Sequence, residues 1–344
     1  MKAPILLTLA GVTTAVVLSA QTQSTPSTAL LVLSKGDLTL STVDPSTLKV
    51  LGRVPSGPDP HEVIASADGR TAYISNYGGG SFNTITPVDL VAQKALEPIQ
   101  LGAIRGPHGL VFAGGKLWFT AEGSKAIGRY DPVSKQIDLV LGTGQNRTHM
   151  LYVFPDLNRI VTSNITSASM TFIERGTMTG RGGGGGGGRG DAAEINWDET
   201  VIPVGRGAEG FDVSPDGTQI WAANAQDGTI SVIDVAAKKV IDTLAANVAS
   251  ANRLKFTPDG KQVLVSSLRL PDLAIFDAST RKEAKRIPIG RGAAGLEVQP
   301  DGKRAFVSCT PDDYVAVIDL ASQTVAGKID AGKQPDGLAW AARR

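Results

Sequence analysis

Residues 214–234 read SPDGTQIWAANAQDGTISVID and contain two features that recur along the chain. In the first, an Asp-Gly pair joins two apolar stretches. In the second, an apolar stretch ends in an acidic residue, here Asp234. Asp-Gly between such stretches favours a tight hairpin turn, because glycine adopts positive φ without a Cβ clash. The segment therefore predicts short antiparallel strands joined by tight turns.

Both features repeat at a nearly constant period. The Asp-Gly turn returns at Asp68-Gly69, Asp216-Gly217, Asp259-Gly260 and Asp301-Gly302. The strand-ending acids are Asp44, Asp89, Asp131, Glu174, Asp234, Asp277 and Asp319, spaced by 45, 42, 43, 60, 43 and 42 residues. An acid at such a place accepts backbone N–H bonds and fixes a turn, so we interpret these acids as structural.

Seven units of four short strands predict an all-β fold, a seven-bladed β-propeller of four-stranded antiparallel blades. One blade combines both chain ends. Its three outer strands are expected at Ala29–Ser34, Leu38–Asp44 and Leu48–Val54, and its innermost strand at Gly337–Ala341. Closure of this kind removes free sheet edges. We therefore expect residues 29–344 to form a single domain.

Composition narrows the classes of partner. The 344 residues include 34 basic and 33 acidic side chains, for a net charge of +1, and aromatic residues make up only 5%. Such a balance argues against a polycation that binds nucleic acid or a membrane surface, and few aromatic side chains are present for base stacking. Nucleic acid is therefore not an expected partner, and we expect a monomer.

The N-terminus has the pattern of a secretory signal. Lys2 precedes an apolar run from Ile5 to Leu18, and a small residue, Ala20, offers a cleavage site. The prediction is a signal peptide over residues 1–20, a leader over 21–28, no membrane span after signal removal, and a secreted, periplasmic or extracellular protein. Cys309 is the only cysteine, so no intramolecular disulfide can form.

The 60-residue spacing indicates an insertion over residues 176–191. It contains seven consecutive glycines, from Gly182 to Gly188. No Gly-Lys-Ser/Thr sequence closes this run, so it lacks the pattern of a phosphate-binding loop. We expect a flexible connection between the third and fourth strands of one blade.

Tyr73-Ile74-Ser75-Asn76 after Asp68-Gly69, and the looser Trp221-Ala222-Ala223-Asn224 after Asp216-Gly217, resemble the repeat of the YVTN β-propellers. The resemblance spans roughly residues 29–341. Related lactonase-like propellers include lactone hydrolases and a lyase, and many YVTN proteins have no catalytic activity. The resemblance therefore implies a fold rather than a reaction.

Alignment of the repeats brings all three histidines of the chain into one column. The column starts each innermost strand and contains His61, His108, His149, Glu209, Asn252, Ala294 and Asp336. In a propeller this column surrounds one mouth of the central channel. Three imidazoles and a carboxylate are suitable ligands for a zinc- or copper-like ion, so His61, His108, His149 and Glu209 are candidate metal ligands. A metal-free ligand or acid–base site and a purely structural role are the alternatives.

Two further rings accompany the column. Cations precede it in five units: Arg105, Arg147, Arg206, Arg291 and Lys333. Together with Asp336, and with Asn76, Asn164 and Asn224 at the turn after each second strand, they are candidate ligand-binding residues for an anion. Glu122 occupies the asparagine position next to His108. Glu122, His108 and His149 are therefore candidates for acid–base catalysis.

Two functional hypotheses follow. The first is a secreted YVTN-type propeller that binds a small molecule, an anion, a metal ion or a polymer end at the channel mouth. The second is a metal-dependent lactonase or lyase that uses the His/Glu half-ring on the same face. The sequence contains none of the Gly-x-Ser-x-Gly, His-Glu-x-x-His or Cys-x-x-Cys motifs that would specify a reaction.

Overall fold

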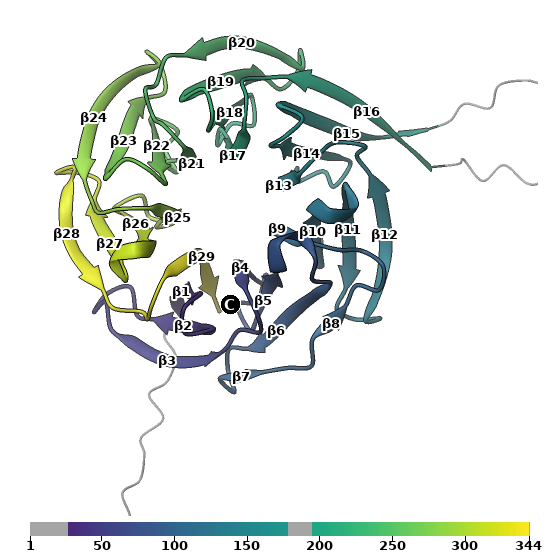
Figure 1. Cartoon of the computed structure of the whole chain (residues 1–344), viewed down its shortest axis with the longest axis horizontal. Helices are drawn as coiled ribbons and strands as arrows, with labels where there is room; N and C mark the ends of the chain where they lie inside the picture. Colours follow the sequence, from purple (N-terminus) through teal and green to yellow (C-terminus); the bar gives the residue numbers. More distant parts are fainter. Residues whose placement is uncertain (1–26, 178–194, 344) are drawn as a thin grey trace, which may run out of the picture.

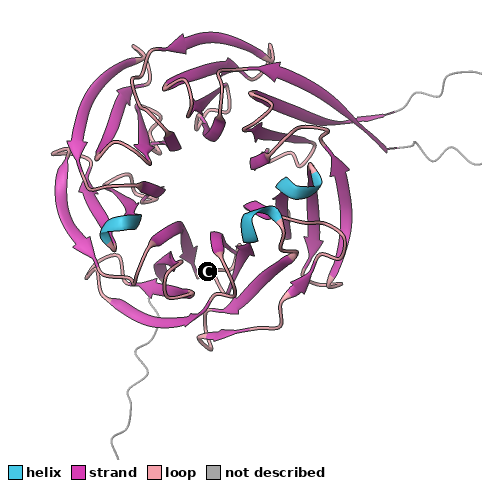
Figure 2. Cartoon of the chain, in the orientation of Figure 1, coloured by secondary structure: helices cyan, strands magenta, loops and turns pink. Residues whose placement is uncertain are grey.

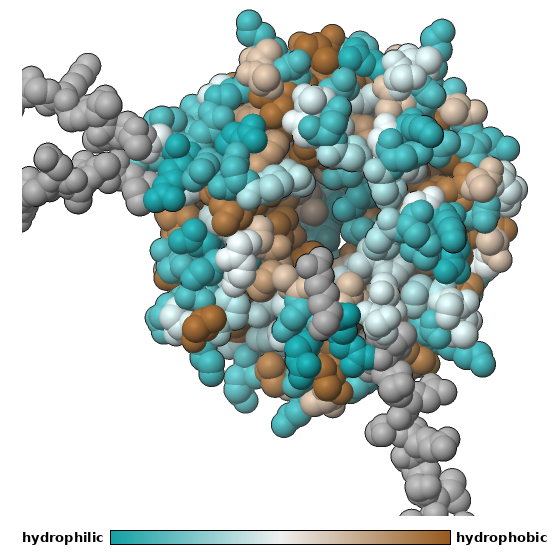
Figure 3. Space-filling view, turned by 180° about the vertical axis from the view of Figure 1, so that it is seen from behind, coloured by the Kyte–Doolittle hydropathy of each residue, from teal (hydrophilic) through white to brown (hydrophobic). Residues whose placement is uncertain are grey.

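The protein is a seven-bladed β-propeller, as the repeat predicts. The computed structural model describes residues 27–177 and 195–343, and its seven sheets surround a central channel (Figure 1). Strands form nearly all of the regular structure, and three single-turn 3₁₀ helices lie at Gly78–Gly80, Glu122–Ser124 and Thr310–Asp312 (Figure 2). Seen from behind, the ring is hollowed at its centre (Figure 3).

Blades 1 to 3 follow one another in chain order, each starting with its innermost strand. Blade 1 contains β4(Pro60–Ala65), β5(Thr71–Asn76), β6(Thr84–Asp89), β7(Lys94–Ala95) and β8(Ile99–Gln100). Blade 2 contains β9(Pro107–Ala113), β10(Lys116–Ala121), β11(Ala126–Asp131) and β12(Gln136–Gly142). Blade 3 contains β13(Thr148–Val153), β14(Arg159–Asn164), β15(Ser169–Thr177) and β16(Ile195–Pro203).

Blades 4 to 6 continue the ring in the same order. Blade 4 contains β17(Ala208–Val213), β18(Gln219–Asn224), β19(Thr229–Asp234) and β20(Lys239–Leu244). Blade 5 contains β21(Ala251–Phe256), β22(Gln262–Ser267), β23(Asp272–Asp277) and β24(Lys282–Pro288). Blade 6 contains β25(Ala293–Val298), β26(Arg304–Cys309), β27(Tyr314–Asp319) and β28(Thr324–Ile329).

The seventh blade closes the ring with both ends of the chain, as expected. Its strand order is β29(Pro335–Ala342), β1(Thr28–Ser34), β2(Thr39–Val43) and β3(Val50–Pro55). β29 pairs antiparallel with β1, in register from Thr28–Ala342 to Val32–Leu338. The last strand of the chain therefore becomes the innermost strand of a blade begun by the first.

The turn chemistry explains the repeat. Gly69, Gly217, Gly260 and Gly302 all have φ between +65° and +72°. In the equivalent turn of blade 3 a non-glycine residue, Leu157, takes φ +58°. Six of the seven strand-ending acids accept backbone N–H bonds from the turn that follows, at Asp44, Asp89, Asp131, Asp234, Asp277 and Asp319.

Glu174 is the exception among these acids. Its carboxylate pairs with Lys238 of the next blade, and β15 continues past it to Thr177. Arg175, Gly176 and Thr177 pair with Trp197, Asn196 and Ile195. Strand pairing thus continues through Gly176, where the insertion is expected to start, to Thr177. The glycine run, the predicted signal peptide and most of the predicted leader lie outside the described residues.

The core consists of one apolar cluster at each blade-to-blade interface. Seven such clusters occur among the described residues, for example Trp221, Val232 and Phe256 between blades 4 and 5. A single blade cannot bury both of its faces, so each blade depends on its neighbours for stability. Among the described residues, no helix is long and apolar enough to cross a membrane.

Candidate functional site at the channel mouth

A cavity of about 510 Å³ lies at one mouth of the channel. All seven column positions line it: His61, His108, His149, Glu209, Asn252, Ala294 and Asp336. Lys35, Tyr77, Arg147 and Arg253 contribute the other charged or aromatic groups of the wall. The seven repeats thus present one residue each to a common space, as the alignment predicts.

The backbone aims these side chains by a shared irregularity. In every blade the pairing of the innermost strand with the next one shifts at the column residue and its successor. In blade 3, for example, pairing is regular at Thr148 and resumes at Leu151, which leaves His149 and Met150 out of register. Bulges of this kind re-aim side chains and are common at sheet edges and near binding sites.

The residue after the column is often glycine for a steric reason. A Cβ at Gly109, Gly210, Gly295 or Gly337 would lie 2.1–2.7 Å from the carbonyl oxygen of the next blade's column residue. In blades 2, 3 and 6 a hydroxyl on the second strand bonds the carbonyl of the next blade's column residue. Thr120 donates to His149 O, Ser163 to Glu209 O and Ser308 to Asp336 O, at 2.6–2.7 Å. Adjacent blades are therefore coupled directly beneath the cavity.

His149 lies at the centre of a buried ionic network. Its Nδ1 is 2.5 Å from Glu122 Oε1, and its Nε2 is 3.0 Å from Glu209 Oε1. Both His149 and Glu122 are buried. Burial alone would lower the pKa of His149, but Glu209 and Glu122 on either side raise it to about 9. His149 is therefore an imidazolium at neutral pH.

Glu122 is held ionised by its neighbours. It accepts hydrogen bonds from the hydroxyl of Tyr77 and from Arg147 Nε at 3.3 Å. Burial would raise the pKa of this carboxyl, but the bonds from His149, Tyr77 and Arg147 outweigh burial and lower it to about 2. Tyr77 was not expected from the sequence. Its signal was its position directly after Asn76 in the repeat, one step beyond the aligned ring.

His108 is buried next to His149 but lacks partners of its own. The two ring centroids are 4.0 Å apart, and Nδ1 of His108 has no hydrogen-bond partner among the residues that the structure describes. Burial lowers its pKa well below the usual value, and the charge on His149 adds to the effect. His108 is therefore neutral and keeps a lone pair for a ligand. Within the described part of the chain, Nε2 of His149 also lacks a partner in hydrogen-bond geometry, although Glu209 Oε1 is 3.0 Å away.

His61 belongs to a second, more exposed group. Its Nε2 is 2.7 Å from the ammonium of Lys35, and Asp336 Oδ2 is 3.6 Å from its Nδ1. Burial and Lys35 lower the pKa of His61 to about 4, while burial raises the pKa of Asp336 to about 6. His61 thus accepts a hydrogen bond from Lys35. Its ring centroid is 5.1 Å from that of His108.

The cation ring does not converge on the cavity. Arg147 lines the wall and contacts Glu122. Arg206 and Arg291 are exposed and pair with Asp227 and Asp312. The backbone N–H of Arg105 donates to Ser124, that of Lys333 donates to Asp37, and the guanidinium of Arg105 donates to Ser81 O.

The asparagine ring is buried in the blades. Asn76 donates to Ser56 O and accepts from Thr84 and Thr86, which fixes the third strand against the second. Asn164 and Asn224 make equivalent bonds to hydroxyls of their own blades. The expectation that Glu122 belongs to this ring is wrong, because Ala121 pairs with Pro107 as Asn76 pairs with Pro60. Glu122 lies one residue further along, at the position of Tyr77, and its carboxylate contacts His149.

Arg253 closes the floor of the cavity. It reaches across the channel from β21 to pair with Glu62 on β4, in an ion pair buried on both sides. Below it, Lys255 pairs with Glu297 at 3.1 Å. This layer could not be predicted from the repeat, because position one after the column is glycine in four blades and position three varies from blade to blade.

The comparisons with known proteins agree on the fold. The model of the family described as cytochrome D1 heme domain matches residues 194–304, less than half of the chain. That segment contains no His, Cys, Met or Tyr, the side chains that serve as axial ligands of haem iron. The matched residues therefore do not fit a haem, and the match reflects the blade repeat.

Several solved structures resemble the chain at low sequence identity. A functionally unknown protein from Desulfotomaculum acetoxidans is 12% identical with a TM-score of 0.73, over 92% of this chain and 99% of that one. A putative 6-phosphogluconolactonase from Bacteroides fragilis is 18% identical with a TM-score of 0.70, over 92% and 99%. Hydrazine synthase from Kuenenia stuttgartiensis is 18% identical with a TM-score of 0.64, over 82% and 89%. No curated protein matches significantly. These likenesses show the propeller fold.

Proposed function

We propose that the protein binds a divalent transition-metal ion at the channel mouth, through His108, His149 and Glu122. The three residues offer one ligand atom each within 4.8 Å of one another, and all three are buried. Imidazole and carboxylate are the ligands of zinc- and copper-like ions. A small ligand in the adjoining cavity would then approach the ion from the open side.

The observation that supports this proposal best is the pair of unpartnered imidazole nitrogens, His108 Nδ1 and His149 Nε2. Buried polar atoms normally have partners, and leaving them without one costs about 1–3 kcal/mol. Two such atoms on rings 4.0 Å apart indicate a ligand that bonds both. A cation meets this need, because His108 is neutral and has a lone pair to donate, and His149 gains one when it loses its proton.

The charges of the wall also favour a cation over an anion. Glu122, Glu209, Asp336, Asp59 and Glu62 surround the histidines, and each wall cation is already paired with one of these acids. The remaining positive charge is the imidazolium of His149, which lies between Glu122 and Glu209. We infer that a metal ion replaces this proton when it binds.

The test is metal content and affinity. The purified protein should bind about one equivalent of Zn²⁺ or Cu²⁺ by elemental analysis and calorimetry. The variants His108→Ala, His149→Ala and Glu122→Gln should each weaken Zn²⁺ binding at least about a hundredfold. Asn252→Ala, which changes the same ring position in blade 5, is the matched control. A wild-type protein that binds neither metal, or histidine variants that bind like wild type, would refute the proposal.

A metal-dependent lactonase or lyase is the second candidate. It is favoured by the hydrogen-bonded chain Tyr77–Glu122–His149, which reaches the cavity wall and could transfer a proton. If this function is correct, the Zn²⁺-loaded protein should hydrolyse a panel of lactones. Tyr77→Phe should lower the rate about a hundredfold while metal is retained. Absence of turnover across the panel would reject this candidate and leave metal binding intact.

A further inference from the structure

Blade 1 has an irregular outer edge. In the other six blades the fourth strand is continuous over at least six residues. In blade 1 it is split into β7 and β8, of two residues each, on either side of Pro98. Pro87 in β6 also has no backbone N–H to donate to a carbonyl oxygen of the outer strand. The outer segment therefore bows away from the sheet.

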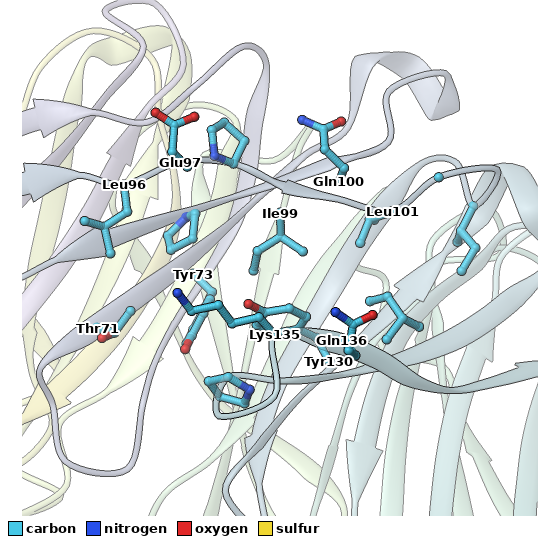
Figure 4. A pocket seen from close by; sticks show the side chains of 16 residues that line it. Thr71, Tyr73, Leu96, Glu97, Ile99, Gln100, Leu101, Tyr130, Lys135 and Gln136 are labelled. Atoms are coloured by element: carbon cyan, nitrogen blue, oxygen red, sulfur yellow. The ribbon is translucent and has the colours of Figure 1, made fainter.

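This bow opens a second cavity, of about 940 Å³, between blades 1 and 2 (Figure 4). In the figure, Leu96, Ile99 and Leu101 follow the bowed segment on one side, and Lys135 and Gln136 face them from the β11–β12 turn. Ile104 and Ile137 add further apolar surface. The volume falls within the range of about 300–1,000 Å³ that is usual for small-molecule sites.

Two buried phenols meet this cavity. Tyr73 is 5% exposed and Tyr130 is 9% exposed, and both line the space. Neither hydroxyl has a hydrogen-bond partner among the residues that the structure describes. Tyr73 is fixed by stacking on Phe112 at 5.9 Å. The rings are buried, but the hydroxyls reach the open space of the cavity, where they can donate to a ligand.

Tyr73, Tyr130 and Lys135 can all donate hydrogen bonds to a ligand in this cavity. Burial raises the pKa of Tyr73 to about 12 and raises that of Tyr130, so both hydroxyls stay protonated and can donate. Lys135 is exposed at the rim and forms no ion pair with any residue in the described part of the chain. The neighbouring carboxylate of Asp131 is instead engaged by Lys116, Val133 and Ser134.

We propose that this cavity binds a small aromatic carboxylate, independently of the channel mouth. The ring lies against the apolar wall formed by Ile99, Leu101 and Ile137. The carboxylate accepts hydrogen bonds from Tyr73 and Tyr130 and faces Lys135. Exposed Glu97, on the opposite wall, disfavours a second negative charge on the ligand.

The experiment uses 2-naphthoate as the probe, titrated into the full-length protein by calorimetry and ligand-observed NMR. Tyr73→Phe and Tyr130→Phe should each weaken binding about tenfold, since each removes one hydrogen bond to a charged acceptor while keeping the ring. Lys135→Gln should weaken it less, about threefold, because the ammonium is exposed. Tyr152→Phe, a tyrosine of blade 3 outside this cavity, is the matched control.

Two comparisons make the outcome decisive. The neutral analogue 2-acetylnaphthalene should bind more weakly than 2-naphthoate, and His149→Ala should bind 2-naphthoate like wild type. Failure of 2-naphthoate to bind, or equal binding by wild type and both phenylalanine variants, would overturn the proposal. Loss of binding in His149→Ala would instead place the probe at the channel mouth and also overturn it. Melting temperatures confirm that each variant is folded.

Discussion

The two halves of the channel-mouth ring have the same backbone geometry but different side chains at the column. Blades 1 to 4 place His61, His108, His149 and Glu209 at the column, and the remaining positions are Asn252, Ala294 and Asp336. The bulge is present in both halves. The fold therefore supplies seven equivalent positions at the mouth, and the residue types at those positions determine the chemistry that each half can offer.

The two halves also differ in how far their charged side chains are buried. On the histidine side, His149 and Glu122 are buried and each shifts the pKa of the other. Elsewhere on the rim, Arg206 and Arg291 form exposed pairs with acids 21 residues later in the chain. Exposed pairs contribute little and are screened by salt, whereas a buried pair strongly changes protonation. On the histidine side, protonation is therefore determined by the buried network.

The largest stability effect should come from the shared backbone rather than from the site. In Gly295→Ala the new Cβ would lie 2.1 Å from Asp336 O, so the two blades must move apart. We expect a loss of about 1–3 kcal/mol in the free energy of unfolding, measured by denaturant titration. Gly142→Ala, with no atom within 4 Å of the new Cβ, is the control. Equal stability of the two variants would show that the blade contact is not tight.

The pKa of His149 should be raised above the ordinary value for histidine, and the pKa values of His61 and His108 should be lowered. His149, raised to about 9, should be an imidazolium at pH 7, whereas His61, lowered to about 4, and His108 should be neutral. NMR of the three imidazoles tests this directly. The stability contributed by His149 is fully present below pH 6.5 and is lost as the pH rises through 9. The contributions of His61 and His108 are present above pH 6.5 and are lost on acidification. If all three imidazoles had pKa values near 6.5, the buried ionic network around His149 would be contradicted.

Metal affinity should depend on pH for the same reason. Between pH 6 and 8, binding of Zn²⁺ must displace the proton of His149, so the affinity should rise about tenfold for each pH unit. Calorimetry in buffers of different ionisation enthalpy should show release of about one proton. The control Asn252→Ala should keep this slope. An affinity independent of pH over this range would mean that His149 is not a ligand.

The sequence predicts the fold and the ring far better than the network within it. The Asp-Gly turns and strand-ending acids are local, so their spacing predicts seven blades and the mixed closing blade. The column also follows from the repeat, because equivalent positions in a symmetric ring share one face. The Arg253–Glu62 pair joins residues 191 positions apart across the channel. Tyr77 likewise reaches Glu122 from the neighbouring blade. No periodic pattern encodes which side chains meet across the ring.

A smaller effect is expected from the hydroxyls that couple adjacent blades. Ser308 donates to Asp336 O at 2.7 Å, and both groups are buried. Ser308→Ala leaves that carbonyl without this donor and should lower the free energy of unfolding by about 1 kcal/mol. Ser322→Ala, at an exposed turn of the same blade, should change it much less. Matching losses in the two variants would show that the coupling adds no stability.

The smallest effect concerns the one place in blades 1 to 6 where this hydroxyl is missing. Blades 1, 2, 3, 5 and 6 have Ser75, Thr120, Ser163, Ser266 and Ser308 at the position, and blade 4 has Ala223. The carbonyl oxygen of Asn252, in the next blade, lies close to Gly210. It is equivalent to the carbonyl oxygens that accept from such a hydroxyl in blades 2, 3 and 6. Ala223→Ser should therefore raise the free energy of unfolding by a few tenths of a kcal/mol, up to about 1. Because Ala223 is fully buried, an unbonded hydroxyl there would instead cost stability. The sign of the change in denaturant titration thus tests whether blade 4 keeps the geometry of its neighbours, and a destabilised variant would show that it does not.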